Sequence, residues 1–211
     1  TGDLGAIAGD TGFLPTASWN GRIRGDFLNT TACLCGNRFG RGLLRPGGTA
    51  YDLDADGCAD MLARIKTAGR DVRGAMDVML HTESVLERLT GTGYVSRESA
   101  QNLGLVGMAA RACGLKVDAR FHFPLADLPT RDCAPRVETT GDVLARTLVR
   151  SKEIDDSLRL LEADISTLAS LPPLAEQPDA EALANMPPDT LAVSQVEGWR
   201  GEICHVAVTG P

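Results

Sequence analysis

Apolar residues recur every three or four positions over most of the chain, which is the spacing of one buried helix face. Near the start, Leu4, Ile7 and Ala8 have this spacing and predict the end of a helix. A second, amphipathic helix is predicted within Trp19–Phe39. Gly36 is expected to stop it, because glycine readily adopts the left-handed conformation found after many helices.

The segment Asp52–Leu89 carries two phases of apolar stripe. Gly69 separates the two phases, and the pattern is reset again near His81. Either two helices or one kinked helix would satisfy this spacing.

A long helix is predicted to open at 140–142 and to run for about 28 residues, as the core helix of a bundle. Its expected buried stripe comprises Leu144, Leu148, Ile154, Leu158, Leu161, Ile165 and Leu168. Its expected solvent-facing side comprises Arg146, Arg150, Lys152, Glu153, Asp155 and Asp156.

The central stretch Ser96–Arg120 combines a capping residue, closely spaced glycines and ionisable groups. Ser96 is expected to cap a short helix that Gly104 ends. Gly107 and Gly114 indicate tight turns, or backbone packed where a side chain would not fit. The charged residues among them are Arg111, Lys116, Asp118 and Arg120. They indicate either a charge network inside an assembly or a solvated loop, and composition alone favours the solvated loop.

Two segments predict β structure. Lys116–Phe123 alternates apolar and polar residues as a short strand does, and Val196–Val208 predicts two short strands around Gly198 and Gly201. Residues 171–190 are expected to form an acidic, proline-rich loop or linker. The predicted fold is mainly α, of the α+β class: a helical bundle core with a small β element from the central and C-terminal segments. All 211 residues are taken as one fragment of a single domain.

The net charge of −7 disfavours nonspecific binding to nucleic acid or to an anionic membrane surface. No apolar run of about 18 residues predicts a membrane span, and no leader pattern is present. The six cysteines show neither CxxC spacing nor the density of a disulfide scaffold, so free thiols in a reducing setting are expected. The first residue is Thr and the last segment reads as an interrupted strand, so we expect a piece of a longer protein.

Candidate chemistry is sparse. Cys33 and Cys35 on a helix would point about 200° apart and could not share an ion. Cys113 has no partner where one is needed, since position 116 is Lys, so we expect the fragment to bind no metal or cofactor. The histidines are scattered, and the GTGYVS segment at 91–96 lacks the following Lys and the preceding strand of a phosphate loop. Asp3, on an apolar helix end, is the one carboxylate expected to be desolvated. It is therefore either a proton carrier or a helix-end residue paired with an arginine.

Five pieces of the sequence match one family in order. They are DLGA at 3–6, GNRFGRGLLRPGG at 36–48, ERLTGTGYVSRESAQNLGLVGMAARACGLKVDAR at 87–120, GDVLARTLVRSKEIDDSL at 141–158 and EGWRGEICHVAVTG at 197–210. The chain resembles the large subunit of membrane-bound, energy-converting nickel-iron hydrogenases of the formate hydrogenlyase and hydrogenase 4 type. Through them it resembles the related 49 kDa subunit of complex I, the NADH-quinone oxidoreductase.

The resemblance implies a helical large subunit that docks against a small iron-sulfur subunit and membrane-arm subunits, peripheral on the cytoplasmic face of the cell membrane. In the hydrogenases a nickel-iron centre is held by two cysteine pairs, one upstream of DLGA and one downstream of the final strand. This fragment would hold neither pair. The complex I branch implies quinone binding and NAD binding instead.

Residue by residue, the resemblance implies a proton- or quinone-linked role for Asp3. Arg111, Asp118 and Arg120 match the family's RxSGxxxDxR pattern, with Cys113 replacing its Ser. Arg200, Gly201 and Glu202 match the RGE-like turn of the family. The resemblance therefore implies a structural charge network that comprises Arg111, Asp118, Arg120, Arg200 and Glu202. The segment EGWRGEICH is closer to the hydrogenase-like branch than to the quinone branch.

Three functions follow as hypotheses. The first is that the chain is the central scaffold of a nickel-iron hydrogenase-like oxidoreductase large subunit, with electron transfer coupled to a membrane complex. The full-length protein is then expected to be an active enzyme, and this fragment, which lacks the metal-ligand cysteines, to be inactive. Alternatively, the chain is a quinone-reducing complex I-like subunit or a non-catalytic helical interaction module. Because its neighbours are absent, apolar faces around Leu4–Phe13 and Ile203–Val208 are expected to be exposed, so the fragment is expected to self-associate.

Overall fold

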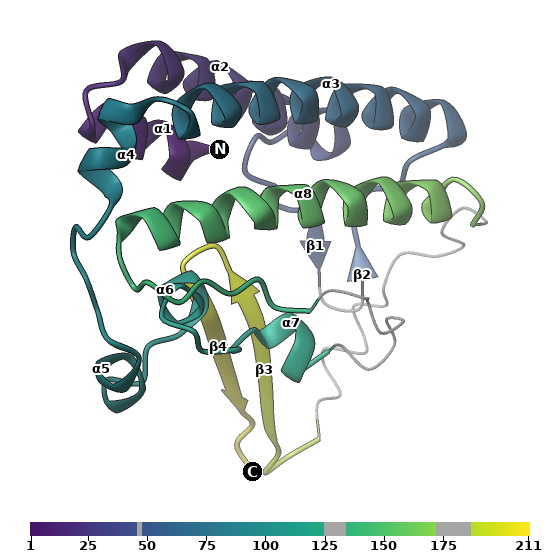
Figure 1. The fold of residues 1–211 in the computed structure, drawn as a ribbon. Coiled ribbons are helices and arrows are strands. Elements are labelled where there is room, and N and C mark those ends of the chain that lie inside the picture. Colours follow the sequence, from purple (N-terminus) through teal and green to yellow (C-terminus); the bar gives the residue numbers. More distant parts are fainter. Residues whose placement is uncertain (46–47, 125–133, 172–186) are drawn as a thin grey trace. The chain divides into compact units, whose positions relative to one another are not determined.

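The computed structural model describes residues 1–45, 48–124, 134–171 and 187–211 (Figure 1). The chain divides into two compact units. The first unit comprises Thr1–Met79 and Ser157–Pro187, and the second comprises Leu80–Asp156 and Pro188–Pro211. The loop or linker predicted at 171–190 lies largely outside the described residues.

The first unit opens with a helical hairpin. Helix α1 (Gly2–Asp10) and helix α2 (Leu14–Cys35) confirm the two predicted helices, although α2 begins earlier than predicted because a proline occupies its first turn. Gly12, with φ of 76°, makes the turn between them. Gly36 ends α2 in the left-handed conformation, as predicted, and its N–H donates to the Ala32 carbonyl.

Helix α3 (Ala55–Leu80) and helix α4 (Glu83–Leu89) settle the alternatives for the next segment in favour of two helices. The break falls beside His81, whereas Gly69 lies inside α3. Gly69 packs closely against Leu158: a Cβ there would lie 3.1 Å from Cδ1 of Leu158, so a larger residue would require that side chain to shift. The glycine-rich loop before α3 contains a small antiparallel hairpin, β1 (Leu44–Arg45) and β2 (Gly48–Thr49), that the sequence did not predict.

Helix α8 (Val143–Leu168) is the predicted long helix and supplies residues to both units. The Asp142 carboxylate caps it by accepting a hydrogen bond from the Ala145 N–H at 2.8 Å. The predicted stripe is only partly correct: Leu158 and Ile165 are buried, but Leu161 is 41% exposed. The buried face instead includes Ala145, Val149, Leu158, Ile165 and the charged Asp156.

Besides α4 and the part of α8 up to Asp156, the described residues of the second unit form three short helices and a hairpin. They are α5 (Arg97–Asn102), α6 (Gly107–Ala112), α7 (Ala119–His122), β3 (Leu191–Gly198) and β4 (Gly201–Val208). Ser96 caps α5 as predicted, accepting from the Ser99 N–H at 3.0 Å. The two C-terminal strands are confirmed as an antiparallel pair, with Glu197 opposite Glu202 and Gly198 opposite Gly201.

The predicted strand Lys116–Phe123 is wrong. The segment forms the single turn α7, because the Asp118 carboxylate accepts a hydrogen bond from the Arg120 N–H and caps a helix there. Its alternating aromatics bury no sheet face, since Phe121 and Phe123 are 53% and 57% exposed. The β structure therefore comes from the glycine-rich loop and the C-terminal segment.

Glycines permit close backbone contacts in the second unit. A Cβ on Gly107, whose φ is 65°, would lie 2.3 Å from Cα of Gly201. The start of α6 therefore meets the β3–β4 turn main chain to main chain. A Cβ on Gly141 would lie 2.1 Å from the Val95 carbonyl oxygen. The prediction that the central glycines mark backbone packed too closely for a side chain is confirmed at Gly107.

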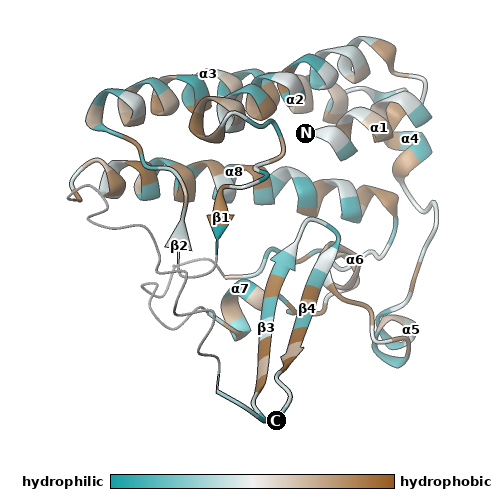
Figure 2. Cartoon of the chain, turned by 180° about the vertical axis from the view of Figure 1, so that it is seen from behind, coloured by the Kyte–Doolittle hydropathy of each residue, from teal (hydrophilic) through white to brown (hydrophobic). Residues whose placement is uncertain are grey.

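The far half of the hairpin is exposed. Val193 and Val206, which face each other across the strands, are 61% and 60% exposed, and apolar positions alternate along both strands in Figure 2. This agrees with the expectation that an apolar face around Ile203–Val208 is exposed. The expectation for Leu4–Phe13 is wrong, because Leu4 and Ala8 are buried against α2. Among the described helices, none has the length and apolar composition to cross a membrane.

Candidate functional site

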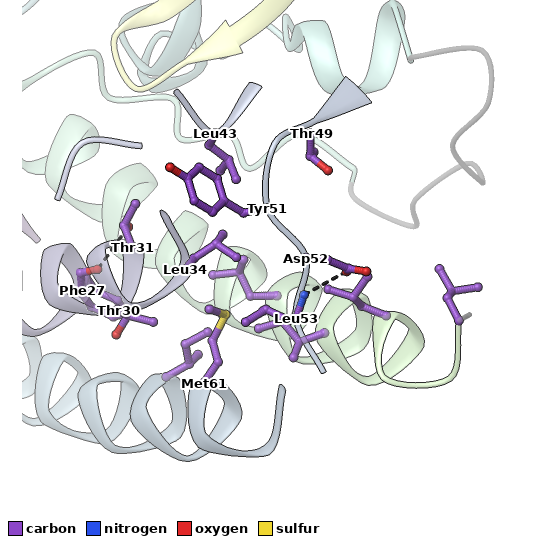
Figure 3. A pocket seen from close by; sticks show the side chains of 15 residues that line it. Phe27, Thr30, Thr31, Leu34, Leu43, Thr49, Tyr51, Asp52, Leu53 and Met61 are labelled. Carbon is purple, nitrogen blue, oxygen red and sulfur yellow. Dashed lines mark hydrogen bonds between the residues drawn. The ribbon is translucent and has the colours of Figure 1, made fainter. Parts of the chain in front are cut away.

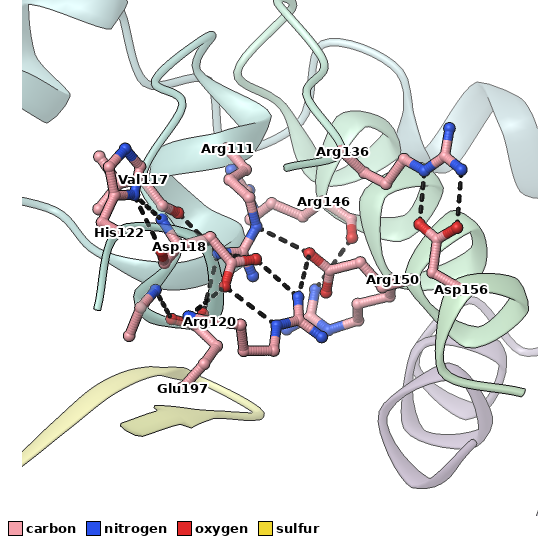
Figure 4. Close-up of polar contacts among 12 residues, drawn as sticks. Arg111, Val117, Asp118, Arg120, His122, Arg136, Arg146, Arg150, Asp156 and Glu197 are labelled. Carbon is pink, nitrogen blue, oxygen red and sulfur yellow. Dashed lines mark hydrogen bonds and ion pairs between the residues drawn. The ribbon is translucent and has the colours of Figure 1, made fainter. Parts of the chain in front are cut away.

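A buried arginine lies at the centre of the second unit. Arg111, on α6, is only 2% exposed and is the largest fully buried side chain among the described residues. Its Nη1 donates hydrogen bonds to the Val117 carbonyl at 2.7 Å and to Oε1 of Glu197 at 2.9 Å (Figure 4). Its Nε lies 2.7 Å from Oε1 of Glu153. Three separate segments of the chain therefore converge on one guanidinium.

A second arginine completes the arrangement. Arg120 clamps Asp118 with two hydrogen bonds, from Nε to Oδ1 at 3.0 Å and from Nη2 to Oδ2 at 2.6 Å. Asp118 Oδ2 also lies 3.5 Å from Nη1 of Arg111. Glu197 reaches from β3 to the start of α7, where its Oε2 accepts from the Ala119 N–H at 2.9 Å. We call these five residues the carboxylate–arginine cluster: Arg111, Asp118, Arg120, Glu153 and Glu197.

The local sequence explains how each side chain is placed. Arg111 lies in the last turn of α6, where a cation is favoured by the helix dipole. Asp118 is held as the cap of α7, and Glu197 stands on β3 one residue before the hairpin turn. Glu153 follows Val149 by four residues on α8 and therefore shares its buried face. The cluster joins α6, α7, α8 and β3.

The carboxyl groups of the cluster are not equivalent. Burial would raise the pKa of Asp118, but the hydrogen bonds from Arg120 and the charges of both arginines outweigh it, so that pKa lies below its ordinary value. Burial raises the pKa of Glu153 above its ordinary value, and the charges of Arg111 and Arg120 offset this only in part. The hydrogen bond with Asp118 raises the pKa of Arg120. The cluster therefore favours the ionised form of Asp118 more strongly than that of Glu153.

The burial of the cluster distinguishes between the two interpretations of the central charged residues, a charge network and a solvated loop. Arg111 and Asp118 are each 2% exposed, so the solvated-loop reading, which composition favoured, is wrong for them. It holds for Lys116, which is exposed. The structure brings Arg111, Asp118 and Arg120 together, as the resemblance implied.

The other two members of the predicted network lie elsewhere. Arg200 is exposed and its guanidinium lies 4.8 Å from the ring centroid of Trp199. Glu202 stands opposite Glu197 across the hairpin, but Glu197 makes the contact with Arg111. Sequence reasoning also missed Glu153, which it placed on the solvent side of α8. The available signal for Glu153 was its spacing of four residues from Val149 and three from Asp156.

Asp3 lies in the first turn of α1 and is partly buried, in the other unit. A carboxylate in this position interacts favourably with the helix N-terminus, while the predicted pairing of Asp3 with an arginine stays a prediction. The structure does not test its proposed role as a proton- or quinone-linked acid, which stays a prediction.

The described cysteines do not fit a nickel-iron centre. Cys33 is exposed, whereas Cys35 is buried and its thiol donates to the Thr31 carbonyl at 3.5 Å. Cys113 is buried, its thiol lies 3.4 Å from the Val95 carbonyl oxygen, and burial raises its pKa, which keeps the thiol protonated. All five described cysteines are free thiols, as expected; Cys133 lies outside the described residues.

The first unit contains an open, mainly apolar pocket of about 850 Å³ (Figure 3). Its lining comes from α2, the segment around β1 and β2, the start of α3 and the end of α8. The apolar lining includes Phe27, Leu34, Leu53, Met61, Ile65 and Ile165. The polar lining residues are few: Thr30, Thr31, Thr49, Tyr51 and Asp52. The pocket suits an apolar occupant and lacks convergent ionisable groups for chemistry.

Comparison with known proteins identifies the family. The sequence model described as "Respiratory-chain NADH dehydrogenase, 49 Kd subunit" matches residues 10–208. The chain belongs to this family. Among curated relatives, an NADH-quinone oxidoreductase subunit of Bacillus mycoides is 30% identical over 198 residues, which cover 90% of this chain and 51% of the relative. A second NADH-quinone oxidoreductase subunit, from Chloroherpeton thalassium, is 28% identical over 203 residues, covering 96% and 42%.

A third relative, an NADH-quinone oxidoreductase subunit of Aquifex aeolicus, is 31% identical over 186 residues, covering 88% of this chain and 32% of the relative. The chain thus spans about half the length of the first of these relatives, and less of the others. The fold is shared with a chain of the membrane-bound sulfane sulfur reductase, an archaeal respiratory membrane complex. That likeness has a TM-score of 0.82 at 24% identity and covers 98% of this chain and 56% of the other.

Proposed function

We propose that this chain is the central scaffold of an oxidoreductase large subunit that reduces quinone in a complex I-like assembly. The observation that carries the proposal is the family match over residues 10–208, supported by relatives whose names specify NADH-quinone oxidoreductase. The carboxylate–arginine cluster supports the scaffold role, because it fixes α6, α7, α8 and the hairpin to one another. The fragment alone is proposed to be inactive.

A nickel-iron hydrogenase is the second candidate. It is favoured by the segment EGWRGEICH at 197–205, which resembles the hydrogenase-like branch. Cysteine thiolates would hold such a centre, and the centre would supply hydrogen activation. The described cysteines do not offer such a set, since Cys33 and Cys35 differ in burial and burial raises the pKa of Cys113. Cysteine pairs from the remainder of a longer protein would be required.

The proposed partners are a small iron-sulfur subunit and membrane-arm subunits of the same complex, with the chain peripheral on the cytoplasmic face of the membrane. The archaeal neighbour is described as part of a respiratory membrane complex, which supports this placement. NAD binding is not assigned to this chain, because GTGYVS at 91–96 lies between α4 and α5 rather than after a strand. The non-catalytic interaction module is the alternative that applies if no redox activity is found.

The test uses the purified complex that contains the full-length protein. We expect quinone-dependent electron transfer and no stoichiometric nickel, measured by quinone reduction assays and by metal analysis. Stoichiometric nickel with hydrogen oxidation would overturn the quinone assignment in favour of the hydrogenase. A metal-free complex without redox turnover would overturn both.

The role of Asp3 is tested in the same preparation. If Asp3 is a proton- or quinone-linked acid, Asp3→Asn lowers the rate of quinone reduction while the subunit stays assembled. Asp10→Asn, at the other end of α1, is the control and should leave the rate unchanged. Equal rates in wild type and Asp3→Asn would leave only the helix-end role.

A further inference from the structure

The carboxylate–arginine cluster holds one more carboxyl than it has arginines. The guanidinium groups of Arg111 and Arg120 are permanently charged. Opposite them stand the carboxyls of Asp118, Glu153 and Glu197, whose side chains are 2%, 19% and 5% exposed. With every group ionised the cluster would carry one uncompensated negative charge. A buried charge without a partner is expensive and is commonly removed by protonation.

Hydrogen bonding distinguishes the three carboxyls. Both oxygens of Asp118 accept from Arg120, at 3.0 and 2.6 Å. Both oxygens of Glu197 also accept, from Nη1 of Arg111 and from the N–H of Ala119, each at 2.9 Å. These four bonds require oxygen lone pairs and favour the ionised carboxylate. Protonation of Asp118 or Glu197 would therefore weaken bonds that the cluster already makes.

Glu153 differs from both. Its Oε1 lies 2.7 Å from Nε of Arg111 and 3.8 Å from Nη2 of Arg120. The short contact is not a well-directed hydrogen bond, since Oε1 of Glu153 and Nε of Arg111 are both buried without an aligned partner. The ionised form of Glu153 thus receives charge attraction but little hydrogen bonding.

The charged groups around Glu153 come from every element that forms the cluster. Arg111 belongs to α6, Asp118 and Arg120 to the start of α7, and Glu197 to β3. Of the neighbouring charges along α8, Lys152 pairs with Glu138 and Asp156 is clamped by Arg136. Arg150 keeps its charge, because the Arg146 carbonyl to which it donates is neutral. His122 is directed to the Asp118 backbone, with its Nδ1 2.9 Å from that carbonyl oxygen. Among the described residues, Glu153 itself forms ion pairs with Arg111 and Arg120 and with no other cation.

We propose that the carboxylate–arginine cluster is a proton-binding site in which Glu153 carries one exchangeable proton. With the proton bound, two guanidinium charges balance two carboxylates; when it leaves to solvent, the cluster takes one negative charge. The proton can exchange with solvent, because Glu153 and Arg120 are the two partly exposed members of the cluster, with side chains 19% and 37% exposed. The raised pKa of Glu153 agrees with this assignment. The site goes beyond the proposed quinone function and does not depend on the electron acceptor.

The first test is a titration of the glutamate side-chain carboxyls in the full chain by carbon-13 NMR. The signal of Glu153 is assigned through bonds and confirmed by its loss in Glu153→Gln. We expect its midpoint to lie above that of Glu162, a residue of the same helix outside the cluster. A Glu153 midpoint equal to or below that of Glu162 would overturn the proposal.

The second test compares stability between pH 5 and pH 8 by urea unfolding. A carboxyl whose folded pKa is raised stabilises the fold fully below its unfolded pKa, and this contribution is lost as pH rises through the folded pKa. Glu153→Gln, a neutral isostere of the protonated form, should remove that loss. Glu162→Gln should retain the wild-type profile. An unchanged profile in Glu153→Gln would contradict the assignment even where the NMR signals overlap.

Discussion

The two units of the chain are stabilised by different chemistry. In the first, buried helix faces carry apolar side chains such as Leu4, Ile23 and Val72, which are at most 1% exposed. In the second, the largest buried side chain is Arg111, and glycines bring main chains into contact. Apolar packing tolerates small changes of shape, whereas a buried ion network and a backbone contact do not. Substitutions of the same type should therefore have unlike effects in the two units.

The largest difference is expected at arginine. Arg111→Ala leaves Glu197 and Asp118 buried without their central cation, which should lower the free energy of unfolding by about 3–5 kcal/mol. Arg64→Ala is the matched control, since Arg64 pairs with Asp60 on an exposed surface of α3 and its loss should change stability little. Urea unfolding followed by circular dichroism measures both. Equal effects would show that the cluster does not stabilise the fold.

The next difference is expected at glycine. Gly107→Ala places a Cβ 2.3 Å from Cα of Gly201 and forces a side chain into a left-handed conformation. Adding about 1–2 kcal/mol of backbone strain to about 1–3 kcal/mol of overpacking predicts a loss of about 2–5 kcal/mol. Thermal unfolding would detect this change. A wild-type melting temperature would mean that the hairpin turn moves away from α6 at little cost.

A smaller effect is expected from acid. Because the pKa of Asp118 is depressed in the folded state, its contribution is present above about pH 3.9 and is lost as pH falls through the folded pKa. Asp118→Asn should lower stability at pH 7 by about 1.5–3 kcal/mol, the worth of charge-assisted hydrogen bonds. The free energy of unfolding of the variant should also fall less steeply than that of the wild type as the pH is lowered. Urea midpoints measured from pH 7 down to pH 3 test the slope, and an unaltered slope would reject the ion pair as its cause.

The smallest effect has the opposite sign. Gly21 lies inside α2, is exposed, and would meet nothing within 4 Å if it carried a Cβ. Gly21→Ala should therefore stabilise the chain by about 0.5–1 kcal/mol through helix propensity. Measured beside Gly107→Ala, it shows how one substitution reverses sign between the two units. Destabilisation by Gly21→Ala would indicate a contact at this helix face.

The first unit was largely predictable from sequence because its helices bury periodic apolar residues. The spacing of Leu4 and Ala8 and the stop at Gly36 were read correctly. The pattern failed where charged residues are buried: Glu153 and Asp156 were assigned to solvent although they face Arg111 and Arg136. The spacing of apolar residues cannot predict that a carboxylate is buried when the arginine that pairs with it is distant in the sequence.

The candidate site was predictable only in part. Arg111, Asp118 and Arg120 are close in sequence, and their pattern was recognised through the family resemblance. Glu197 comes from 86 residues away from Arg111, and the resemblance pointed to Glu202 instead. Glu197 and Glu202 are opposite each other in the hairpin, so only its placement against α6 decides which one reaches the arginine. The strand predicted at Lys116–Phe123 failed because a side-chain cap outweighed alternation.

The contact between Gly107 and Gly201 also limits how the family can diverge. A steric conflict between two side chains is relieved when a mutation at either position makes one of them smaller. Here both residues are glycines, so neither has a side chain that could become smaller. A larger residue at one position therefore has no compensating substitution at the other, and the two glycines should be retained or lost together with the local path of the chain.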